Sequence, residues 1–435
     1  MLSNYKKIGD LIQLVDVRNK ELTVTKLLGL SVSKKFIPSV ANTVGTNMRN
    51  YKIIRKNQFA CSIMQVRRDK KIPVALLEDF EEAIISQAYP VFEVKNDDEI
   101  MPEYLMMWMS RLEFDREACF LAVGGVRGSL EWEDFCNMEL PVPSIKKQRA
   151  IVKEYNTVVN RIKLNEQLNQ KLEETAQALY KHWFVDFEFP FDFTKGEPSK
   201  KGKPYKSSGG KMVWNEELEE DIPEGFEYLS IQSLIDYEII FKNQDGNHGE
   251  IHPKASDYVS NGIPFIMAKD IKNGTINLDS CSFISKEHSE RLRIDPAISD
   301  DVLITHKATM GRVGIVPKID DYLVLTPQVT YYRVKNKNKI NKEYLYCLFC
   351  SGEFQQEFIG FSEQSTRKFL SITNQRLLKI ILPAKEVLKM FKEKISYLNL
   401  YKNNINKELN KLSELLEVLN SKMSKVETHI QAVPL

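Results

Sequence analysis

Polar and basic side chains gather in a few stretches of this chain, and they are of the types that bind nucleic acid. Lys and Arg neutralise phosphates, while Arg, Gln and Asn can form paired hydrogen bonds with a base edge in the major groove. The candidates in the first half are Arg49, Lys52, Arg55, Lys56, Gln65, Arg67, Arg68, Lys70, Lys71 and Arg127. Those in the second half are Lys269, Thr305, His306, Lys307, Thr309, Arg312, Gln364, Thr366, Arg367 and Lys368. For each of them, a solvated surface position is the alternative.

The net charge of +2 hides a strong segregation of charge. Residues 1–75 hold 15 basic residues against 4 acidic ones, a balance of +11, whereas residues 76–140 hold 4 against 16, a balance of −12. This pattern is consistent with a basic face toward a polyanion and an acidic face elsewhere. Two solvated faces that meet in ion pairs explain it equally well.

Catalytic motifs do not emerge from the sequence. It has no phosphate-binding GxxxxGK[ST] loop, no HExxH, no GxSxG and no (D/N)PPY motif of the kind that amino-methyltransferases use to hold a base. Cys347 and Cys350 form a CxxC, but the surrounding YLYCLFC favours a buried helix over a metal or redox site. His248 and His252 lie in the turn-rich DGNHGEIHPK, which favours a solvated loop. We expect no catalysis, no metal and no cofactor in this chain.

An internal duplication is the strongest signal. At an offset of 240 residues, 12 of the 37 positions from 94 to 130 are identical, including Arg127 and Arg367. Near the starts of the copies the offset is 223, since Tyr5 and Ile8 recur as Tyr228 and Ile231. The second copy therefore carries 17 extra residues between its first element and the matched core.

Each copy ends in a long amphipathic helix whose apolar residues recur in steps of four and three, which is typical of a coiled coil. The seam of the first helix includes Ile151, Tyr155, Val158, Ile162, Leu172 and Leu179. The seam of the second includes Phe391, Ile395, Leu398, Ile405, Leu409, Leu412, Leu416 and Leu419. Asn165, Asn169 and Lys402 interrupt the seams, and such polar residues usually fix register. Ordinary bundle packing is the alternative.

The order of globular unit, helix, globular unit, helix predicts the fold class. If the two helices pair, the second must run back along the first, so the pair is antiparallel. We therefore predict an α+β protein, with two mixed α/β domains separated by an antiparallel coiled coil and related by a pseudo-two-fold. The strands are expected within 50–64, 88–96, 262–266, 273–278, 301–317 and 322–334, and the helices at 101–120 and 340–361.

These features together resemble the DNA-specificity subunit of type I restriction-modification systems. The phrases that carry the resemblance are GIPFI with KDIKNG, DVLITHKATMGRVGIVP, KEYLYCLF, LPVPSIKKQRAIV and ALYKHWFVDFEF, and they are spread over the whole chain. The second copy has LPAKEVLKMFKEKI where the first has the Pro- and Gln-containing LPVPSIKKQRAIV. The resemblance implies a first target-recognition domain at 1–143, a central helix at 144–186, a linker at 187–226, a second target-recognition domain at 227–383 and a C-terminal helix at 384–428.

What the resemblance implies about function is specific. Each domain would read one half of a split, asymmetric sequence in double-stranded DNA, and the helices would set the spacer. Two methylation subunits would dock on the chain, bring S-adenosylmethionine and methylate an adenine in each half-site. A translocating restriction subunit is a further expected partner. The chain itself would be a non-catalytic subunit.

Two other classes of function compete with this prediction. A coiled-coil scaffold that joins proteins would have no affinity for DNA, and it leaves the basic first segment unexplained. A nuclease built from scattered acids would cleave DNA in a metal-dependent manner. The scattered cysteines, the absence of an apolar stretch of about 18 residues and the polar N-terminus predict a cytoplasmic protein without a membrane span.

Overall fold

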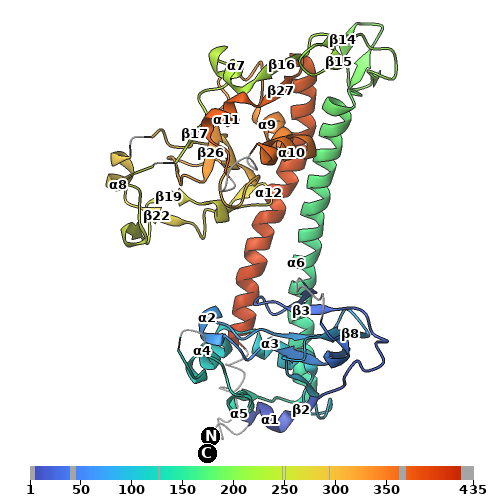
Figure 1. Ribbon diagram of the computed structural model, residues 1–435, viewed down its shortest axis with the longest axis vertical. Coiled ribbons are helices and arrows are strands. Elements are labelled where there is room, and N and C mark those ends of the chain that lie inside the picture. The colour runs from blue at the N-terminus through green and yellow to red at the C-terminus, as the bar shows by residue number, and fades with distance from the viewer. Residues whose placement is uncertain are drawn as a thin grey trace, which may run out of the picture. The chain divides into compact units, whose positions relative to one another are not determined.

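The computed structural model describes residues 5–39, 46–125, 128–246, 248–249, 251–292, 294–361 and 369–422. The chain forms two compact units (Figure 1). Unit 1 contains residues 1–166 and 406–435, and unit 2 contains residues 167–405. Each unit therefore includes a segment of both long helices.

Unit 1 is built on an antiparallel four-stranded sheet with the strand order β2-β9-β6-β7. The strands are β2 (Ile12–Val15), β9 (Val91–Val94), β6 (Phe59–Cys61) and β7 (Val74–Leu76). Phe59 and Phe92 stack on neighbouring strands with ring centroids 5.0 Å apart, and both are fully buried. The helices that share this core are α1 (Ile8–Leu11), α3 (Pro102–Met109), α4 (Leu112–Leu121) and α5 (Trp132–Asn137), with α2 (Val66–Asp69) contacting α4.

Three small antiparallel sheets complete unit 1. They pair β1 (Tyr5–Lys7) with β10 (Glu139–Pro141), β3 (Leu28–Leu30) with β4 (Phe36–Pro38), and β5 (Lys52–Arg55) with β8 (Glu82–Ile85). The single turn η1 (Met48–Asn50) precedes β5.

Unit 2 repeats the same plan. Its antiparallel sheet has the order β17-β26-β23-β24, formed by β17 (Gln244–Asp245), β26 (Val329–Tyr332), β23 (Val302–Thr305) and β24 (Val313–Ile315). The strands β16 (Glu227–Ser230) and β27 (Lys379–Leu382) pair as β1 and β10 do. The helices α7 (Ile231–Asp236), α9 (Lys342–Cys350), α10 (Gly352–Gly360) and α11 (Ile372–Leu377) stand in the places of α1, α3, α4 and α5. The predicted duplication is confirmed by this shared topology.

The buried tyrosines Tyr104 and Tyr344 show the repeat at the level of single bonds. The Tyr104 hydroxyl donates to the carbonyl of Pro141, and the Tyr344 hydroxyl donates to the carbonyl of Ile381. The segment 101–120 forms two helices instead of the predicted one, and so does the segment 340–361, which forms α9 and α10. Ser351 has an extended conformation between them, and its side chain caps α10 by accepting from the backbone N–H of Phe354.

A second sheet sets unit 2 apart from unit 1. It has the order β18-β22-β19-β25, in which only β19 and β25 pair in parallel. Its strands are β18 (Tyr258–Val259), β22 (Ser282–Ile284), β19 (Ile263–Ile266) and β25 (Val324–Leu325). The hairpin β20 (Ile271–Lys272) to β21 (Thr275–Ile276), the turns η3 (Ala255–Asp257) and η4 (Ala268–Asp270), and α8 (Lys286–Arg291) belong to the same region. The extra residues of the second copy therefore lie in a part of the unit that adds structure to the shared sheet.

The segment 187–226, which the sequence predicts to be a linker, is folded. It contains β11 (Pro190–Asp192), β12 (Glu197–Pro198), β13 (Lys203–Pro204), β14 (Met212–Asn215) and β15 (Glu220–Pro223). Phe189 stacks on Tyr205 and on Phe226, with ring centroids 4.6 and 5.4 Å away, respectively. The Gly, Pro and Lys residues mark its surface turns, while the aromatic residues between them build a small core.

The two long helices are α6 (Ile145–Tyr180) and α12 (Lys385–Lys422), of 36 and 38 residues. A π-helical turn, η2 (Lys181–Val185), extends α6. Tyr180 packs on Phe391, while Glu173 contacts Lys402, so within unit 2 the helices run antiparallel as predicted. Within unit 1, Arg161 forms an ion pair with Glu408 at 2.6 Å.

The predicted seam residues of both helices are all buried or half-buried. Several apolar residues just outside the seam are instead exposed, which shows that the stripe is narrow. These are Leu164, Leu168, Tyr397, Leu400, Tyr401, Leu415 and Val418. A narrow stripe is the pattern of a coiled-coil seam.

Candidate nucleic-acid interface

The candidates around β5 in unit 1 are mostly tied to acids. Lys56 pairs with Glu81 at 2.7 Å, and Arg55 lies 3.9 Å from Glu82. Lys52 is half-buried, donates to the carbonyl of Tyr89 and lies 3.8 Å from Asp16. Burial lowers the pKa of Lys52. Arg49, in η1, is exposed. This group thus shows the ion pairing between the basic and acidic segments that was the alternative to a DNA face.

A second group of candidates surrounds α2. Gln65 and Lys70 flank this helix with φ angles of 63° and 51°, and the buried Val66 anchors it. Arg67, Arg68, Lys70 and Lys71 are all exposed. Arg68 pairs with its neighbour Asp69. Within the described part of the chain, neither Lys70 nor Lys71 forms an ion pair.

The α2 group lies against the loop that follows α4. The Arg67 guanidinium donates to the carbonyl of Gly124 at 2.8 Å. The Arg67 side chain also packs closely on Gly128, since a Cβ there would lie 2.8 Å from Cδ of Arg67. Arg127 belongs to this loop but lies outside the described residues. We call residues 65–71 together with residues 123–125 and 128–129 of this loop the α2 edge.

In unit 2 the hairpin between β23 and β24 divides the candidates into buried and exposed ones. Thr305 is fully buried, and its hydroxyl accepts from the backbone N–H of Arg312 at 2.9 Å. His306 is buried against Thr330, with its Nδ1 2.7 Å from that hydroxyl, and burial lowers its pKa to about 4. The structure therefore places these two side chains in the core, contrary to their prediction as DNA contacts. Residues 301–306 are all buried and the exposed residues begin at Lys307, a boundary between strand and loop that the sequence alone did not locate.

The exposed residues of this hairpin meet other candidates. Lys307 and Thr309 face solvent, and half-buried Arg312 donates to the carbonyl of Ala268, beside exposed Lys269. Lys307 forms a β-bridge with Phe369. Gln364, Thr366, Arg367 and Lys368 directly precede Phe369 and lie outside the described residues. We call residues 307–312 together with Lys269 and Phe369 the β23–β24 edge.

The two edges occupy the same place in the repeated fold. The backbone N–H of Leu130 donates to the carbonyl of Ile63, and that of its repeat partner Leu370 donates to the carbonyl of His306. Gln65 follows Ile63 by two residues, as Ala308 follows His306, and both have a φ angle of 63°. In both units, then, the backbone of the shared leucine meets the segment that follows the third strand of the sheet. Exposed cations lie at this place in each unit although the local sequences differ.

Exposed apolar residues at or next to the two edges were missed by the sequence analysis. Phe120 is 83% exposed at the end of α4, and Val123 is 64% exposed in the following loop. Phe369 is exposed at the β23–β24 edge. An apolar residue gives no signal of exposure by its type, so the sequence offered no basis for including them.

Metal and redox sites are not supported by the described residues. Among these residues no group of three or more His, Cys, Asp or Glu side chains is arranged to hold a metal ion. His248 pairs with Asp245 at 2.7 Å instead of with His252. Cys347 is buried in α9, and burial raises the pKa of Cys350 to about 12, so both stay thiols.

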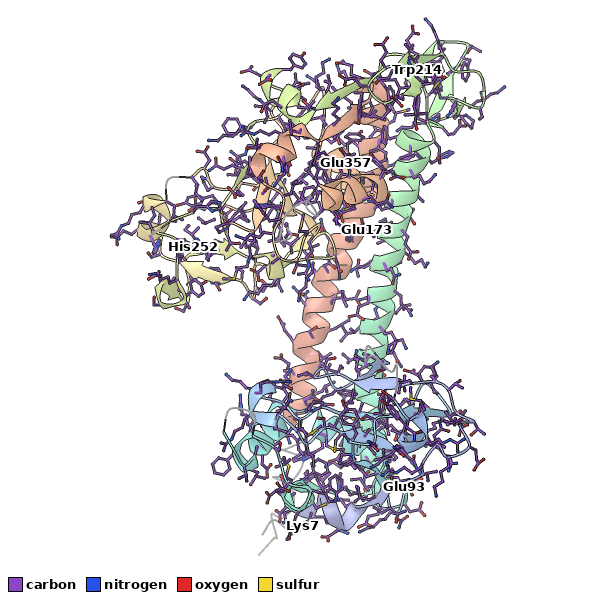
Figure 2. All side chains as sticks on the ribbon, viewed as in Figure 1. Lys7, Glu93, Glu173, Trp214, His252 and Glu357 are labelled. Atoms are coloured by element: carbon purple, nitrogen blue, oxygen red, sulfur yellow. The ribbon has the colours of Figure 1, made fainter. Side chains whose placement is uncertain are left out.

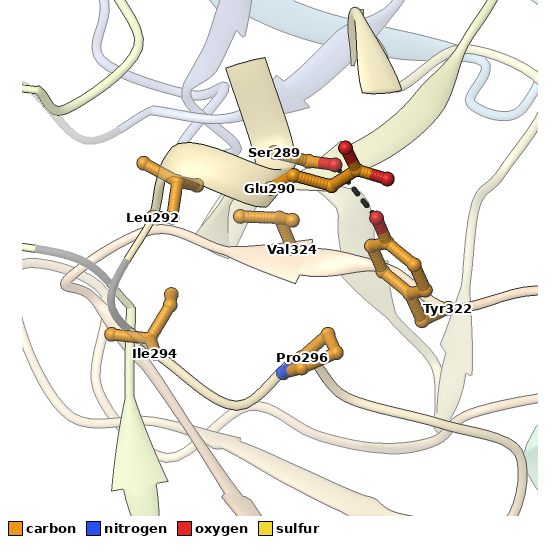
Figure 3. A pocket seen from close by; sticks show the side chains of 7 residues that line it. All are labelled: Ser289, Glu290, Leu292, Ile294, Pro296, Tyr322 and Val324. Atoms are coloured by element: carbon orange, nitrogen blue, oxygen red, sulfur yellow. Dashed lines mark hydrogen bonds between the residues drawn. The ribbon is translucent and has the colours of Figure 1, made fainter. Parts of the chain in front are cut away.

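One pocket lies in the part of unit 2 that unit 1 lacks (Figure 3). It has a volume of about 260 Å³ and is lined by Ser289, Glu290, Leu292, Ile294, Pro296, Tyr322 and Val324. The hydroxyls of Ser289 and Tyr322 lie 2.7 Å apart and satisfy each other. Its described lining is largely apolar and pairs no nucleophile with a base, so we assign it no chemistry.

Comparison with known proteins identifies the family of the chain. The family model for the type I restriction modification DNA specificity domain matches the chain twice, over residues 3–174 and 223–417. The chain belongs to this family. The resemblance inferred from the sequence is thereby confirmed. The two matches also coincide with the two copies of the internal duplication.

Individual relatives agree with this family. The type I restriction enzyme MjaIX specificity subunit of Methanocaldococcus jannaschii is 24% identical over 304 residues, which are 68% of this chain and 61% of that protein. The HindI specificity subunit of Haemophilus influenzae is 30% identical over 112 residues, 25% of this chain and 24% of that protein. These alignments span less than two thirds of each relative.

A solved structure shows the same fold. The crystal structure of the type I restriction-modification S subunit from M. genitalium aligns with a TM-score of 0.52 at 14% identity, covering 96% of this chain and 95% of that one. The predicted α+β fold class is confirmed. In the described residues, no helix has the length and apolar character needed to cross a membrane.

Proposed function

We propose that this chain is the specificity subunit of a type I restriction-modification complex and reads both halves of a bipartite, asymmetric DNA target. The observation that carries the proposal is the double match to a DNA specificity domain, once in each copy of the duplication. The two edges provide the chemistry, since each has exposed cations without a described acidic partner, Lys70 and Lys71 in unit 1 and Lys307 in unit 2. Phosphate neutralisation by such residues supplies affinity, and neighbouring polar groups read bases.

The proposal includes a division of labour. Two methylation subunits would bring S-adenosylmethionine and transfer the methyl group to an adenine in each half-site. A restriction subunit would add translocation and cleavage. The recognition chain would act in the cytoplasm, where the DNA is.

The long helices offer a surface for the methylation subunits. Tyr397, Leu400 and Tyr401 are each more than half exposed on α12. Exposed aromatic residues of this kind are enriched at protein interfaces. Changing Tyr397 and Tyr401 to Ser should weaken co-purification of a methylation subunit while leaving DNA binding by the chain unchanged. Unaltered co-purification would move the docking surface elsewhere.

Methyl transfer tests the division of labour. The purified chain should neither bind S-adenosylmethionine nor methylate DNA, and adenine methylation should appear when a methylation subunit is added. Methyl transfer by the chain alone would contradict the proposal. Metal-dependent cleavage by the chain alone would favour the nuclease, and the absence of any DNA affinity would favour the scaffold.

Exchange of one reader tests independent reading. Residues 225–380 should be replaced by the second domain of another family member, and methylated adenines should then be mapped in cells. We expect one half-site to change while the other half-site and the spacer remain. A simultaneous change of both half-sites would contradict the proposal.

A further inference from the structure

Lys402 occupies a seam position of α12 where the repeat calls for an apolar residue. It lies between Leu398 and Ile405 in the seam, and its side chain is only 8% exposed. A buried ammonium loses hydration and is tolerated only with close partners. The partners of Lys402 therefore show what this position does.

Lys402 joins three helices of unit 2. Its Nζ lies 2.6 Å from Oε2 of Glu173 on α6, which Figure 2 labels, and donates to the hydroxyl of Tyr346 on α9 at 3.2 Å. The Tyr346 hydroxyl in turn donates to Glu173 at 2.8 Å. We call these three residues the Lys402 cluster. The second carboxylate oxygen of Glu173 is buried with no hydrogen-bond partner among the described residues, so the cluster is held at an energetic cost.

A fourth element touches the cluster at Gly274. This glycine lies in the turn of the β20–β21 hairpin with a φ angle of 74°. A Cβ at this position would overlap the Tyr346 hydroxyl and lie 2.7 Å from Nζ of Lys402. Gly274 also forms a β-bridge with Gly314 on β24. Through Gly274, the cluster thus connects the two long helices with β24, the strand that directly follows the β23–β24 edge.

The first copy of the fold does without this cluster. At the positions 240 residues earlier, Ile162 stands for Lys402 and Met106 stands for Tyr346, while Ser413 on α12 is the counterpart of Glu173. The repeated architecture therefore forms with apolar residues at the two buried positions. Since a buried ion pair contributes little net stability compared with apolar residues of similar volume, stability does not account for the cluster. Its directional bonds instead restrict how the sheet can sit on the helices.

We infer that Lys402, Glu173 and Tyr346 are positioning residues that hold the second recognition domain in one orientation on the helices, and so make the complex strict about spacer length. The inference rests on the proposed function, because spacer length matters only to a reader of two half-sites. Without the cluster, the domain keeps its fold and its half-site but can adjust its position on the helices.

The test replaces the cluster with the residues of the first copy. A chain carrying Lys402→Ile, Tyr346→Met and Glu173→Ser is assembled with its methylation subunit. Methylation is measured on duplexes with the native spacer and with spacers one base pair shorter or longer. We expect unchanged half-sites and a preference for the native spacer that falls at least tenfold. The matched control is Arg161→Ala with Glu408→Ala, which removes an exposed ion pair from the same helices and should leave the preference intact.

The outcomes separate the inference from the proposed function. If the wild-type complex methylates no bipartite site, the proposed function fails. If the wild type does so and the folded triple variant keeps its full spacer preference, the inference is wrong. Should the triple variant fail to fold, Tyr346→Phe decides, because it removes one hydroxyl from the cluster and preserves the ring. A measurable loss of spacer preference in Tyr346→Phe supports the inference, and an unchanged preference overturns it.

Discussion

Lengthening both helices by one heptad is expected to lengthen the spacer of the DNA target. Seven residues that continue the seam add about 10.5 Å to a helix at 1.5 Å per residue. This length corresponds to roughly three base pairs, since about 10 base pairs of DNA span some 34 Å. The readers must also follow the turn of the DNA groove, so we expect a spacer longer by one to three base pairs with both half-sites retained.

The contacts show where the two insertions must be placed. The internal repeat would match an insertion after Leu172 with one after Leu412, but residues that match in the repeat are not opposite each other in an antiparallel pair. Glu173 contacts Lys402, so the point opposite Leu172 lies directly after Lys402. Insertions after Leu172 and after Lys402 leave the Glu173–Lys402 contact in unit 2 and the Arg161–Glu408 contact in unit 1 intact.

The assay is sequencing of methylated adenines from cells that carry the lengthened chain and its methylation subunits. Insertions of four residues at the same two points are the control. With 3.5 residues per turn they shift the apolar stripe by about 50°, so the pairing and the methylation should be lost. A functional heptad variant with an unchanged spacer would refute the reasoning, because the helices would then not set the distance.

Three further predictions concern single interactions. The double variant Lys70→Ala, Lys71→Ala should weaken DNA binding at all sequences and lower the slope of log affinity against log salt by about 2. The control Lys56→Ala should have little effect, because Lys56 pairs with Glu81. Equal effects of the two would refute the assignment of the α2 edge to DNA binding. Asp301→Ala should lower the free energy of unfolding by about 3–5 kcal/mol in denaturant titrations. The Arg333 guanidinium donates two hydrogen bonds of 2.9 and 2.8 Å to the buried Asp301 carboxylate, and the variant leaves this guanidinium without its partner. Glu238→Ala, at the exposed pair with Lys335, should lower the free energy of unfolding far less, and an equal loss in both variants would contradict the role of burial. The His306 pKa is about 4 in the folded chain, so the unfolded chain takes up the proton first as pH falls below about 6.5, and stability should drop by about 2 kcal/mol between pH 7 and pH 5. His306→Asn should lack this part of the pH dependence, and identical pH profiles of the two proteins would show that His306 is not its source.

The spacing of residues along the chain was enough to predict the duplication, the two long helices and several strands of the sheets, among them β6, β9, β23 and β26. Helical and strand periodicities are local properties of the sequence. The spacing of apolar residues therefore reveals the buried stripe of each long helix, from Ile151 to Leu179 and from Phe391 to Leu419, without reference to any partner. Antiparallel pairing followed from the order of the elements. The family resemblance rested on short phrases spread over both copies, which are also local features of the sequence, and the family model confirmed it.

Only the tertiary structure decided which candidate residues are available to DNA. Lys56 and Lys70 are residues of the same type, yet Glu81 pairs with the first and no described acid pairs with the second. Thr305 and His306 turn into the core, while Lys307 beside them faces solvent. The segment 187–226 folds because Phe189, Tyr205 and Phe226 meet across its turns.

The position opposite Leu172 and the partners of Lys402 also depended on the fold. The seam pattern shows that Lys402 interrupts an apolar stripe, but it does not show which side chains pair with the Lys402 ammonium group. Exposure, ion pairing and register between helices are set by residues far apart in sequence, such as Glu173 and Lys402. Local periodicity carries no information about these pairs, because each depends on how the whole chain closes on itself.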